Sequence, residues 1–259
     1  MRIAVPGSTG MLGKRVVSQA IARGHQVLTP RRTRSDTFLG LDIEFWKDYD
    51  VIINCAGIIP PGPDPTSMIL ANALGPWELA EHARHINARL VHMSTDCVFS
   101  GKEHGWLDSK SSPSPSDLYG KTKLCGEPVG GNVLVVRGSF IGPEHGFFHW
   151  LLHARGVVDA WMSALWNGGS ADRMAEVLLN LAESDQVGIL HVGAEEYVTK
   201  AWMVEYLVEM LNLPVSVNLV REPQIYRALF PDVLLPPVKQ SLDELIAEFN
   251  GDHKWDDLE

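Results

Sequence analysis

The chain opens with a short apolar segment, a glycine-rich loop and a helix-like segment, in that order. Gly7, Gly10 and Gly13 stand at every third position after residues 3–5, and the apolar residues of 12–21 then recur at helical spacing. Glycine permits the tight turn from strand to helix and lets backbone N–H groups at the helix start approach a phosphate. The pattern is typical of the first strand–helix unit of a dinucleotide-binding sheet, although an ordinary glycine-rich turn has the same form.

Strand-like and helix-like segments continue to alternate through the first half of the chain. Apolar, β-branched runs predict strands at 26–28, 49–54, 90–93, 132–136 and 188–192, and a long periodic stretch predicts a helix over 68–86. Strands that alternate with helices imply a parallel sheet covered on both faces. The predicted fold class is therefore α/β, a Rossmann-type doubly wound parallel sheet.

The second half has a different pattern, which predicts a small additional lobe. Residues 140–166 are rich in aromatics, histidine and glycine, and Ser170 and Thr199 could each cap a following helix. Ser241–Glu244 has the form of a capping box that opens a last helix. We expect a cofactor domain over 1–140, completed by about 167–193, and a C-terminal substrate-binding lobe from 141–166 and 194–259.

Composition and charge exclude several classes of protein. The 259 residues carry a net charge of −10, which argues against nucleic-acid binding and against a basic membrane patch. No apolar run approaches the roughly 18 residues of a membrane helix, and we expect no signal peptide before the first strand. The three cysteines lack metal-ligand spacing, so we expect no metal and a reducing, cytoplasmic location.

The end of the second strand bears on the choice of cofactor. An acidic residue there would bind the ribose hydroxyls of NAD, whereas basic residues fit the extra phosphate of NADP. No acid stands at this strand end, and Arg31 and Arg32 follow it. Because guanidinium groups bind phosphate in a bidentate manner, the sequence favours NADP, with NAD as the alternative cofactor.

Tyr119 and Lys123 form the most informative pair of polar residues. They are four positions apart, so on a helix they share a face. A nearby ammonium would stabilise the phenolate and lower the pKa of the tyrosine. Tyr119 could then exchange a proton with a carbonyl or alcohol oxygen, and Thr95, just past a strand end, could hydrogen-bond the same oxygen.

At this point the sequence resembles a known family, the extended short-chain dehydrogenase/reductases, and within them the dTDP-4-dehydrorhamnose reductase branch. The resemblance covers nearly the whole chain and is strongest up to residue 142. The matching pieces include Gly7–Gly13, Asn54–Gly57, Asn72–Pro76, Ser94–Gly101, Tyr119–Lys123 and Arg137–Gly142. It implies reduction of the keto group of a nucleotide-activated 4-keto-deoxysugar, with a homodimer as one possible assembly.

The resemblance also assigns roles to individual residues. The catalytic set is Thr95, Tyr119, Lys123 and Asn72, of which Asn72 would order the lysine through water. The cofactor would contact Gly7, Thr9, Gly10, Met11, Leu12, Gly13, Arg31, Arg32, Asp42, Cys55, Ala56, Gly57, Tyr119 and Lys123. The sugar nucleotide would contact Asp96, Val98, Arg137 and Trp166, while the other tryptophans of the lobe, at 150, 161 and 202, would be core.

Two alternatives stay open beside the reductase. Related dehydratases carry an Asp-Glu pair after the threonine, and here Asp96 is followed by Cys97, so dehydration is disfavoured. An NAD(P)-dependent nucleotide-sugar epimerase is one alternative, and a non-catalytic NADP-binding regulatory subunit is the other. Residues 143–166, which should touch the sugar, align poorly, so the sequence does not identify the sugar.

Overall fold

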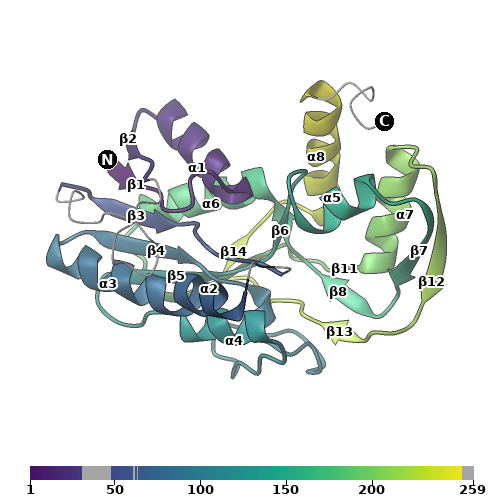
Figure 1. The fold of residues 1–259 in the computed structure, drawn as a ribbon, viewed down its shortest axis with the longest axis horizontal. Coiled ribbons are helices and arrows are strands. Elements are labelled where there is room, and N and C mark those ends of the chain that lie inside the picture. The colour runs from purple at the N-terminus through teal and green to yellow at the C-terminus, as the bar shows by residue number, and fades with distance from the viewer. Residues whose placement is uncertain (31–47, 61, 63, 253–259) are drawn as a thin grey trace.

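The computed structural model describes residues 1–30, 48–60, 62 and 64–252 of the chain. Seven strands of this part form one parallel sheet in the order β2-β1-β3-β4-β5-β10-β14 (Figure 1). Their bounds are β1 Arg2–Ala4, β2 Gln26–Leu28, β3 Val51–Asn54, β4 Arg89–Met93, β5 Val133–Arg137, β10 Gly188–Gly193 and β14 Val233–Leu234. The order reverses between β1 and β3, so the predicted doubly wound α/β sheet is confirmed.

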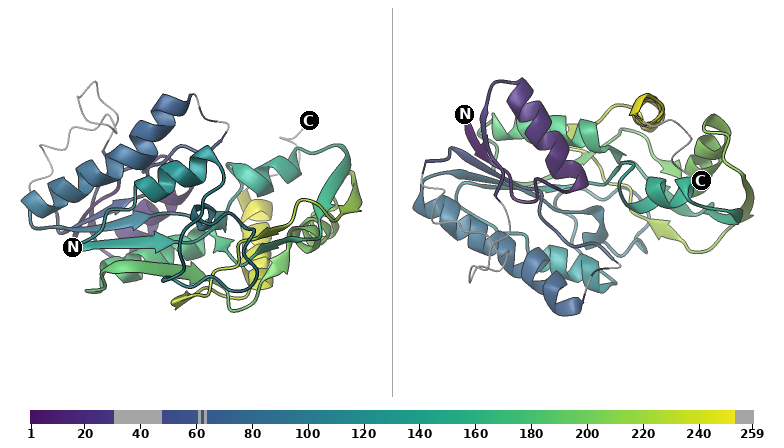
Figure 2. Two further views of the ribbon diagram at one scale, coloured as in Figure 1. Left: turned by 90° about the horizontal axis from the view of Figure 1, so that it is seen from below. Right: turned by 45° about the horizontal axis from the view of Figure 1, so that its top comes forward.

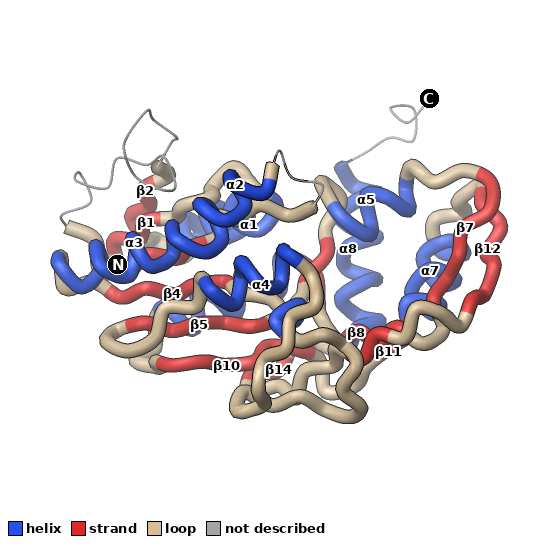
Figure 3. Tube along the Cα trace, turned by 60° about the horizontal axis from the view of Figure 1, so that its bottom comes forward, coloured by secondary structure: helices blue, strands red, loops and turns tan. Residues whose placement is uncertain are grey.

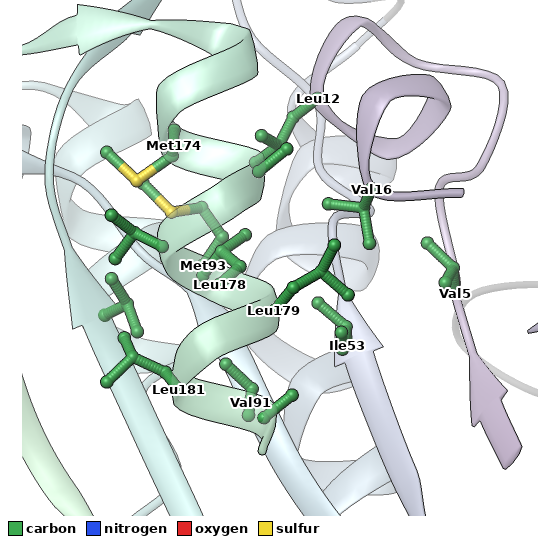
Figure 4. Packing of buried hydrophobic residues seen from close by; sticks show 14 of the residues in the cluster. Val5, Leu12, Val16, Ile53, Val91, Met93, Met174, Leu178, Leu179 and Leu181 are labelled. Carbon is green, nitrogen blue, oxygen red and sulfur yellow. The ribbon is translucent and has the colours of Figure 1, made fainter. Parts of the chain in front are cut away.

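Helices cover both faces of this sheet. In Figure 1, α1 (Met11–Ala22) and α6 (Ala171–Ala182) lie above it, and α2 (Pro65–Ile69), α3 (Gly75–His85) and α4 (Leu118–Cys125) lie below. On the upper face the buried side chains of α1 and α6 interlock with those of the sheet (Figure 4). Val16 and Leu178 are wholly buried there, and burial of each such side chain contributes about 1.5–3 kcal/mol.

The long helix predicted over 68–86 differs in detail from a regular α-helix. A π-helical segment, η2 (Leu70–Leu74), separates α2 from α3, and the chain runs through all three without a break. Asp64 caps α2, since its side chain accepts a hydrogen bond from the Ser67 N–H at 2.8 Å. A π-segment is often found at functional positions, and this one carries the fully buried Asn72.

The predicted C-terminal lobe is present and has its own core. It lies beside the carboxyl ends of the strands, as the views in Figures 2 and 3 show. Its helices are α5 Gly146–Leu152, α7 Lys200–Met210 and α8 Val238–Asp252. Its strands are β6 Phe140–Ile141, β7 Gly156–Trp161, β8 Ala164–Trp166, β9 Gly169–Ser170, β11 Val198–Thr199, β12 Val215–Val220 and β13 Ile225–Tyr226. Buried residues of α5, α7 and α8, among them Phe148, Leu207 and Leu242, pack into one cluster.

Two details of the second half differ from the sequence prediction. Ser170 and Thr199 do cap α6 and α7, accepting from the N–H groups of Arg173 and Trp202. Ser241, however, lies inside α8 and caps nothing, because this helix begins at Val238. The Val238 N–H instead donates to the Glu196 carboxylate at 2.8 Å, so a residue of the loop before β11 caps the helix.

The second difference concerns β14. This strand falls within the stretch predicted to belong wholly to the lobe, yet it pairs with β10 and extends the central sheet. The chain therefore leaves the lobe, completes the sheet and returns to the lobe as α8. No helix in the described part of the chain is both long and apolar enough to cross a membrane.

Candidate active site

The glycine loop after β1 folds tightly on itself. Gly7 has a φ of +80°, and its carbonyl accepts a hydrogen bond from the Gly10 N–H at 2.9 Å. A Cβ on Gly13 would lie 2.0 Å from that same carbonyl oxygen, so only glycine fits there. Helix α1 has no capping side chain and no acidic residue in its first turn. Its start therefore offers backbone N–H groups and a favourable dipole to an anion, which fits the pyrophosphate of a dinucleotide.

A cavity of about 1200 Å³ lies where this loop meets the carboxyl ends of the strands and the lobe. Parallel sheets bind ligands at this edge, where the strand order reverses. Its wall on the sheet side is formed by Gly10, Met11, Leu12, Cys55, Ala56, Gly57, Ile58, Ile59, Pro60, Met93, Ser94, Tyr119 and Lys123. Eight of these were predicted to contact the cofactor or to act in catalysis: Gly10, Met11, Leu12, Cys55, Ala56, Gly57, Tyr119 and Lys123.

Helix α4 brings Tyr119 and Lys123 to this cavity together. Asp117 caps the helix through the Gly120 N–H at 2.7 Å, and Tyr119 and Lys123 follow one turn apart. Lys123 is buried, and its Nζ donates to the Met93 carbonyl at 2.7 Å. A Cβ on Gly120 would lie 2.2 Å from the Cys97 carbonyl oxygen, so glycine lets α4 pack closely on the loop that follows β4.

That loop carries Thr95, which the structure places beside Tyr119. The Thr95 side chain shares a hydrogen bond with Tyr119, which on its own lowers the pKa of the tyrosine. The Thr95 hydroxyl also accepts from the Cys97 N–H and donates to Asp96, both at 3.1 Å. Thr95 itself does not appear in the cavity wall, so it reaches the site through Tyr119.

Burial changes the pKa values of both helix residues. It raises the pKa of Tyr119 above its usual value, and this effect exceeds the lowering due to Thr95. The net shift is therefore upward and not the predicted lowering, because burial outweighs the groups that favour the phenolate. Burial lowers the pKa of Lys123 to about 8, opposed by the charge of Glu127. A protonated tyrosine suits the role of a proton donor.

Glu127 belongs to a buried ion pair behind the site, and its partner is Arg137. The Arg137 Nη2 lies 2.7 Å from Glu127 Oε2, and the Ser94 hydroxyl donates to the same carboxylate at 2.5 Å. The Arg137 guanidinium also lies over the Phe99 ring, 5.5 Å from its centroid. Arg137 is only 3% exposed and is absent from the cavity wall, so the predicted substrate contact is corrected to a structural ion pair.

The other three predicted substrate residues are also not part of the cavity wall. Val98 is wholly buried in a small cluster with Phe99. Asp96 is buried and accepts the Thr95 hydroxyl. Trp166 is buried in the lobe core, where its Nε1 donates to Ser139 Oγ at 2.7 Å. Each position is explained by packing, and none of the three is proposed further as a substrate contact.

The remaining predicted cofactor and catalytic residues divide into three groups. The Asn72 side chain accepts from the Ile58 N–H and donates to the Ile58 carbonyl, both at 2.8 Å, and donates to Thr122 Oγ1 at 3.3 Å. It thereby fixes the loop after β3 against α4, and its predicted role in ordering Lys123 through water stays a prediction. Thr9 lies exposed in the glycine loop. Arg31, Arg32 and Asp42 lie outside the described residues.

The lobe side of the cavity contains residues that the sequence did not single out. Trp150 and Trp161, predicted as core, are 49% and 38% exposed and line the cavity with Phe147 and Lys200. Most of the lobe lining comes from α5 and β7, which fall within residues 143–166, the segment predicted to touch the sugar. In the sequence, only the aromatic-rich composition of this segment indicated such a wall. It did not indicate which aromatic residues face inward.

Arg227 is a further residue that only the structure reveals. It follows β13 in the lobe, and its Nε donates to the Phe99 carbonyl at 3.0 Å and its Nη1 to Cys97 Sγ at 3.1 Å. Its Nη2 lies 3.6 Å from Asp117, the cap of α4. Burial raises the pKa of Cys97 to about 12, so the thiol is neutral. Arg227 therefore ties the lobe to the two segments that position Tyr119.

Comparison with known proteins places this site in a family. The model of the family described as RmlD substrate binding domain matches residues 1–228. A dTDP-4-dehydrorhamnose reductase of Mycolicibacterium smegmatis is 34% identical over 131 residues, which cover 49% of this chain and 40% of the relative. A probable low-salt glycan biosynthesis reductase of Haloferax volcanii is 27% identical over 238 residues, which cover 80% of this chain and 79% of the relative.

A solved structure supports the fold. The dTDP-4-dehydrorhamnose reductase of Bacillus anthracis, crystallised in complex with NADP, superposes with a TM-score of 0.83. The superposition covers 95% of this chain and 99% of that protein, at 18% identity. The likeness extends through both the sheet and the lobe, so the two-part architecture is that of the relative.

Proposed function

The chain belongs to the family described as RmlD substrate binding domain, and on that premise we propose that it reduces the keto group of a nucleotide-activated 4-keto-deoxysugar with NADPH. The observation that carries the proposal is that Tyr119 and Lys123 both line a cavity of about 1200 Å³, with Thr95 hydrogen-bonded to Tyr119 behind its wall. The similar reductases from other organisms support the same class of reaction.

In this proposal the nicotinamide, when bound, supplies the hydride. Tyr119 donates a proton to the substrate oxygen, and its raised pKa keeps that proton in place at neutral pH. Thr95 hydrogen-bonds the tyrosine and orients it, and Lys123 stabilises the phenolate that forms after proton transfer. The tight loop at Gly7 and Gly13 fits the pyrophosphate, as its close backbone approach leaves no room for side chains.

The choice of NADP over NAD rests on Arg31 and Arg32 in the sequence, and NAD remains the alternative. The Bacillus anthracis relative was solved with NADP, which supports the same cofactor here. Equal affinity of the protein for NADPH and NADH would contradict the inference of NADP binding from Arg31 and Arg32.

A nucleotide-sugar partner, a homodimer, a cytoplasmic location and the two-domain division likewise remain predictions.

The direct test is turnover. NADPH absorbance is followed while the protein is mixed with a panel of nucleotide 4-keto-deoxysugars that includes dTDP-4-dehydrorhamnose. We expect stoichiometric NADPH consumption and a reduced sugar nucleotide. Conversion of a sugar nucleotide to its epimer without net NADPH loss would favour the epimerase. Cofactor binding with no conversion of any substrate would favour a regulatory subunit.

The buried lysine predicts a pH dependence. Because the pKa of Lys123 is lowered to about 8, its ammonium is present below that pH and is lost above it. We therefore expect kcat/KM for the cofactor, which reports groups of the free enzyme, to fall above pH about 8. Lys123→Arg should move the fall to higher pH, since arginine stays charged. A profile that stays flat to pH 10 in the intact protein would contradict this assignment.

A further inference from the structure

Lys200 is a cation on the lobe side of the cavity, and neither the glycine loop nor the Tyr119 site uses it. It is the first residue of α7, which Thr199 caps through the Trp202 N–H at 3.1 Å. Lys200 and Val204, one turn apart, both line the cavity, so the start of α7 faces it. The positive end of the α7 dipole lies at the same place.

The ammonium of Lys200 is held over an aromatic ring rather than in an ion pair. Its Nζ lies 4.8 Å from the ring centroid of Phe147, which also lines the cavity. Among the described residues no hydrogen bond or ion pair of Lys200 is found. Lys123 is the contrast, because its Nζ already donates to the Met93 carbonyl. A lysine has three donors, so those of Lys200 are free for a ligand.

The charges around Lys200 are few and lie at longer range. Burial lowers its pKa; the carboxylate of Asp96 opposes that shift, and Arg227 adds to it. Asp159 lines the same cavity, but its carboxylate already accepts from Asn218 Nδ2 at 2.7 Å. A half-buried ammonium without a counter-charge in contact gains from a ligand that brings its own negative charge.

We propose that Lys200 binds the diphosphate of the sugar nucleotide and so orients the sugar toward Tyr119. The inference rests on the proposed function, because it takes a nucleotide-activated sugar as the substrate. Phe147 positions the ammonium by contact with its ring, and the N-terminus of α7 adds to the positive potential. The diphosphate would then bind at the lobe wall of the cavity, and the cofactor would occupy the opposite wall, at the glycine loop.

The test measures binding without turnover. Calorimetric titration of the full chain, saturated with NADP, compares dTDP with thymidine, which has no phosphate. Lys200→Met keeps the apolar stem and removes the charge, and Lys200→Arg keeps the charge. Lys121→Met is the matched control, since Lys121 is exposed on α4.

We expect Lys200→Met to weaken dTDP binding roughly 10- to 100-fold, as for the loss of a charge-assisted hydrogen bond. Lys200→Arg should stay within about threefold of the intact protein, with thymidine binding and NADP binding unchanged in both variants. The inference is overturned if the intact protein does not bind dTDP, if Lys200→Met weakens dTDP no more than Lys121→Met, or if it weakens thymidine equally. Lys200-dependent dTDP binding in a protein that reduces no keto-sugar would refute the proposed function and leave the lysine assignment standing.

Discussion

Tyr119→Phe should lower kcat for the reduction by roughly two to four orders of magnitude, the usual contribution of a positioned general acid. The variant removes one hydroxyl from a half-buried side chain beside Thr95 and keeps the ring that lines the cavity. No other tyrosine lines this cavity in the described part of the chain. Cofactor affinity should be unchanged within a few-fold, because the ring and Lys123 remain.

The experiment combines steady-state NADPH oxidation with fluorescence titration of NADPH binding. Tyr197→Phe is the matched control, since Tyr197 is 47% exposed and lies outside the cavity wall, where its ring packs near Trp106. This control should retain full activity. Near-normal turnover in Tyr119→Phe would refute the proposed proton donor, while a loss of NADPH binding would mean that the hydroxyl holds the cofactor instead.

The parts of the site that could be predicted from the sequence depend on residues that are close together in the chain. The glycine loop follows from three residues at fixed spacing between a strand and a helix, and the Tyr119–Lys123 pair follows from helical periodicity. Both patterns need only a few neighbouring residues to be recognised. The parallel sheet is equally accessible, because its strands are short apolar runs such as Val51–Asn54.

The parts that could not be predicted depend on which atoms meet after folding. Arg137 and Trp166 stood next to site-like motifs, but tertiary packing directs one to Glu127 and the other to Ser139. The pKa of Tyr119 depends on how much water is removed around it, and a helical spacing carries no such information. Trp161 faces the cavity from a strand whose pairing with β12 is non-local.

Ser241 shows the same limit for local structure. The capping-box spacing was present, yet α8 begins at Val238 because Glu196, 42 residues earlier, supplies the acceptor at its N-terminus. A local motif predicts a helix start only where no distant group competes for it. Asn72 likewise has distant partners that its sequence neighbours do not indicate, since its amide bonds the Ile58 backbone.

Arg137→Met should lower the free energy of unfolding by about 3–5 kcal/mol, as expected when one partner of a buried ion pair is removed. The side chains of Arg137 and Glu127 are 3% and 4% exposed, so the remaining carboxylate would be left buried without its cation. Urea denaturation at pH 7 measures the change. If Arg137 were instead a substrate contact, the variant would raise KM for the sugar nucleotide and leave the unfolding midpoint where it was.

Two further variants separate the ion pair from a general loss of packing. Adding Glu127→Gln to Arg137→Met removes the unpaired charge while keeping an acceptor for the Ser94 hydroxyl, so the double variant should recover part of the lost stability. Arg173→Met is the control, because its pair with Glu244 is about one third exposed and should contribute about 0–1 kcal/mol. If the loss in the free energy of unfolding of the double variant equals the sum of the losses of Arg137→Met and Glu127→Gln, the two residues act independently. The ion pair would then contribute nothing specific to holding β5 against the end of α4, the helix that carries Tyr119 and Lys123.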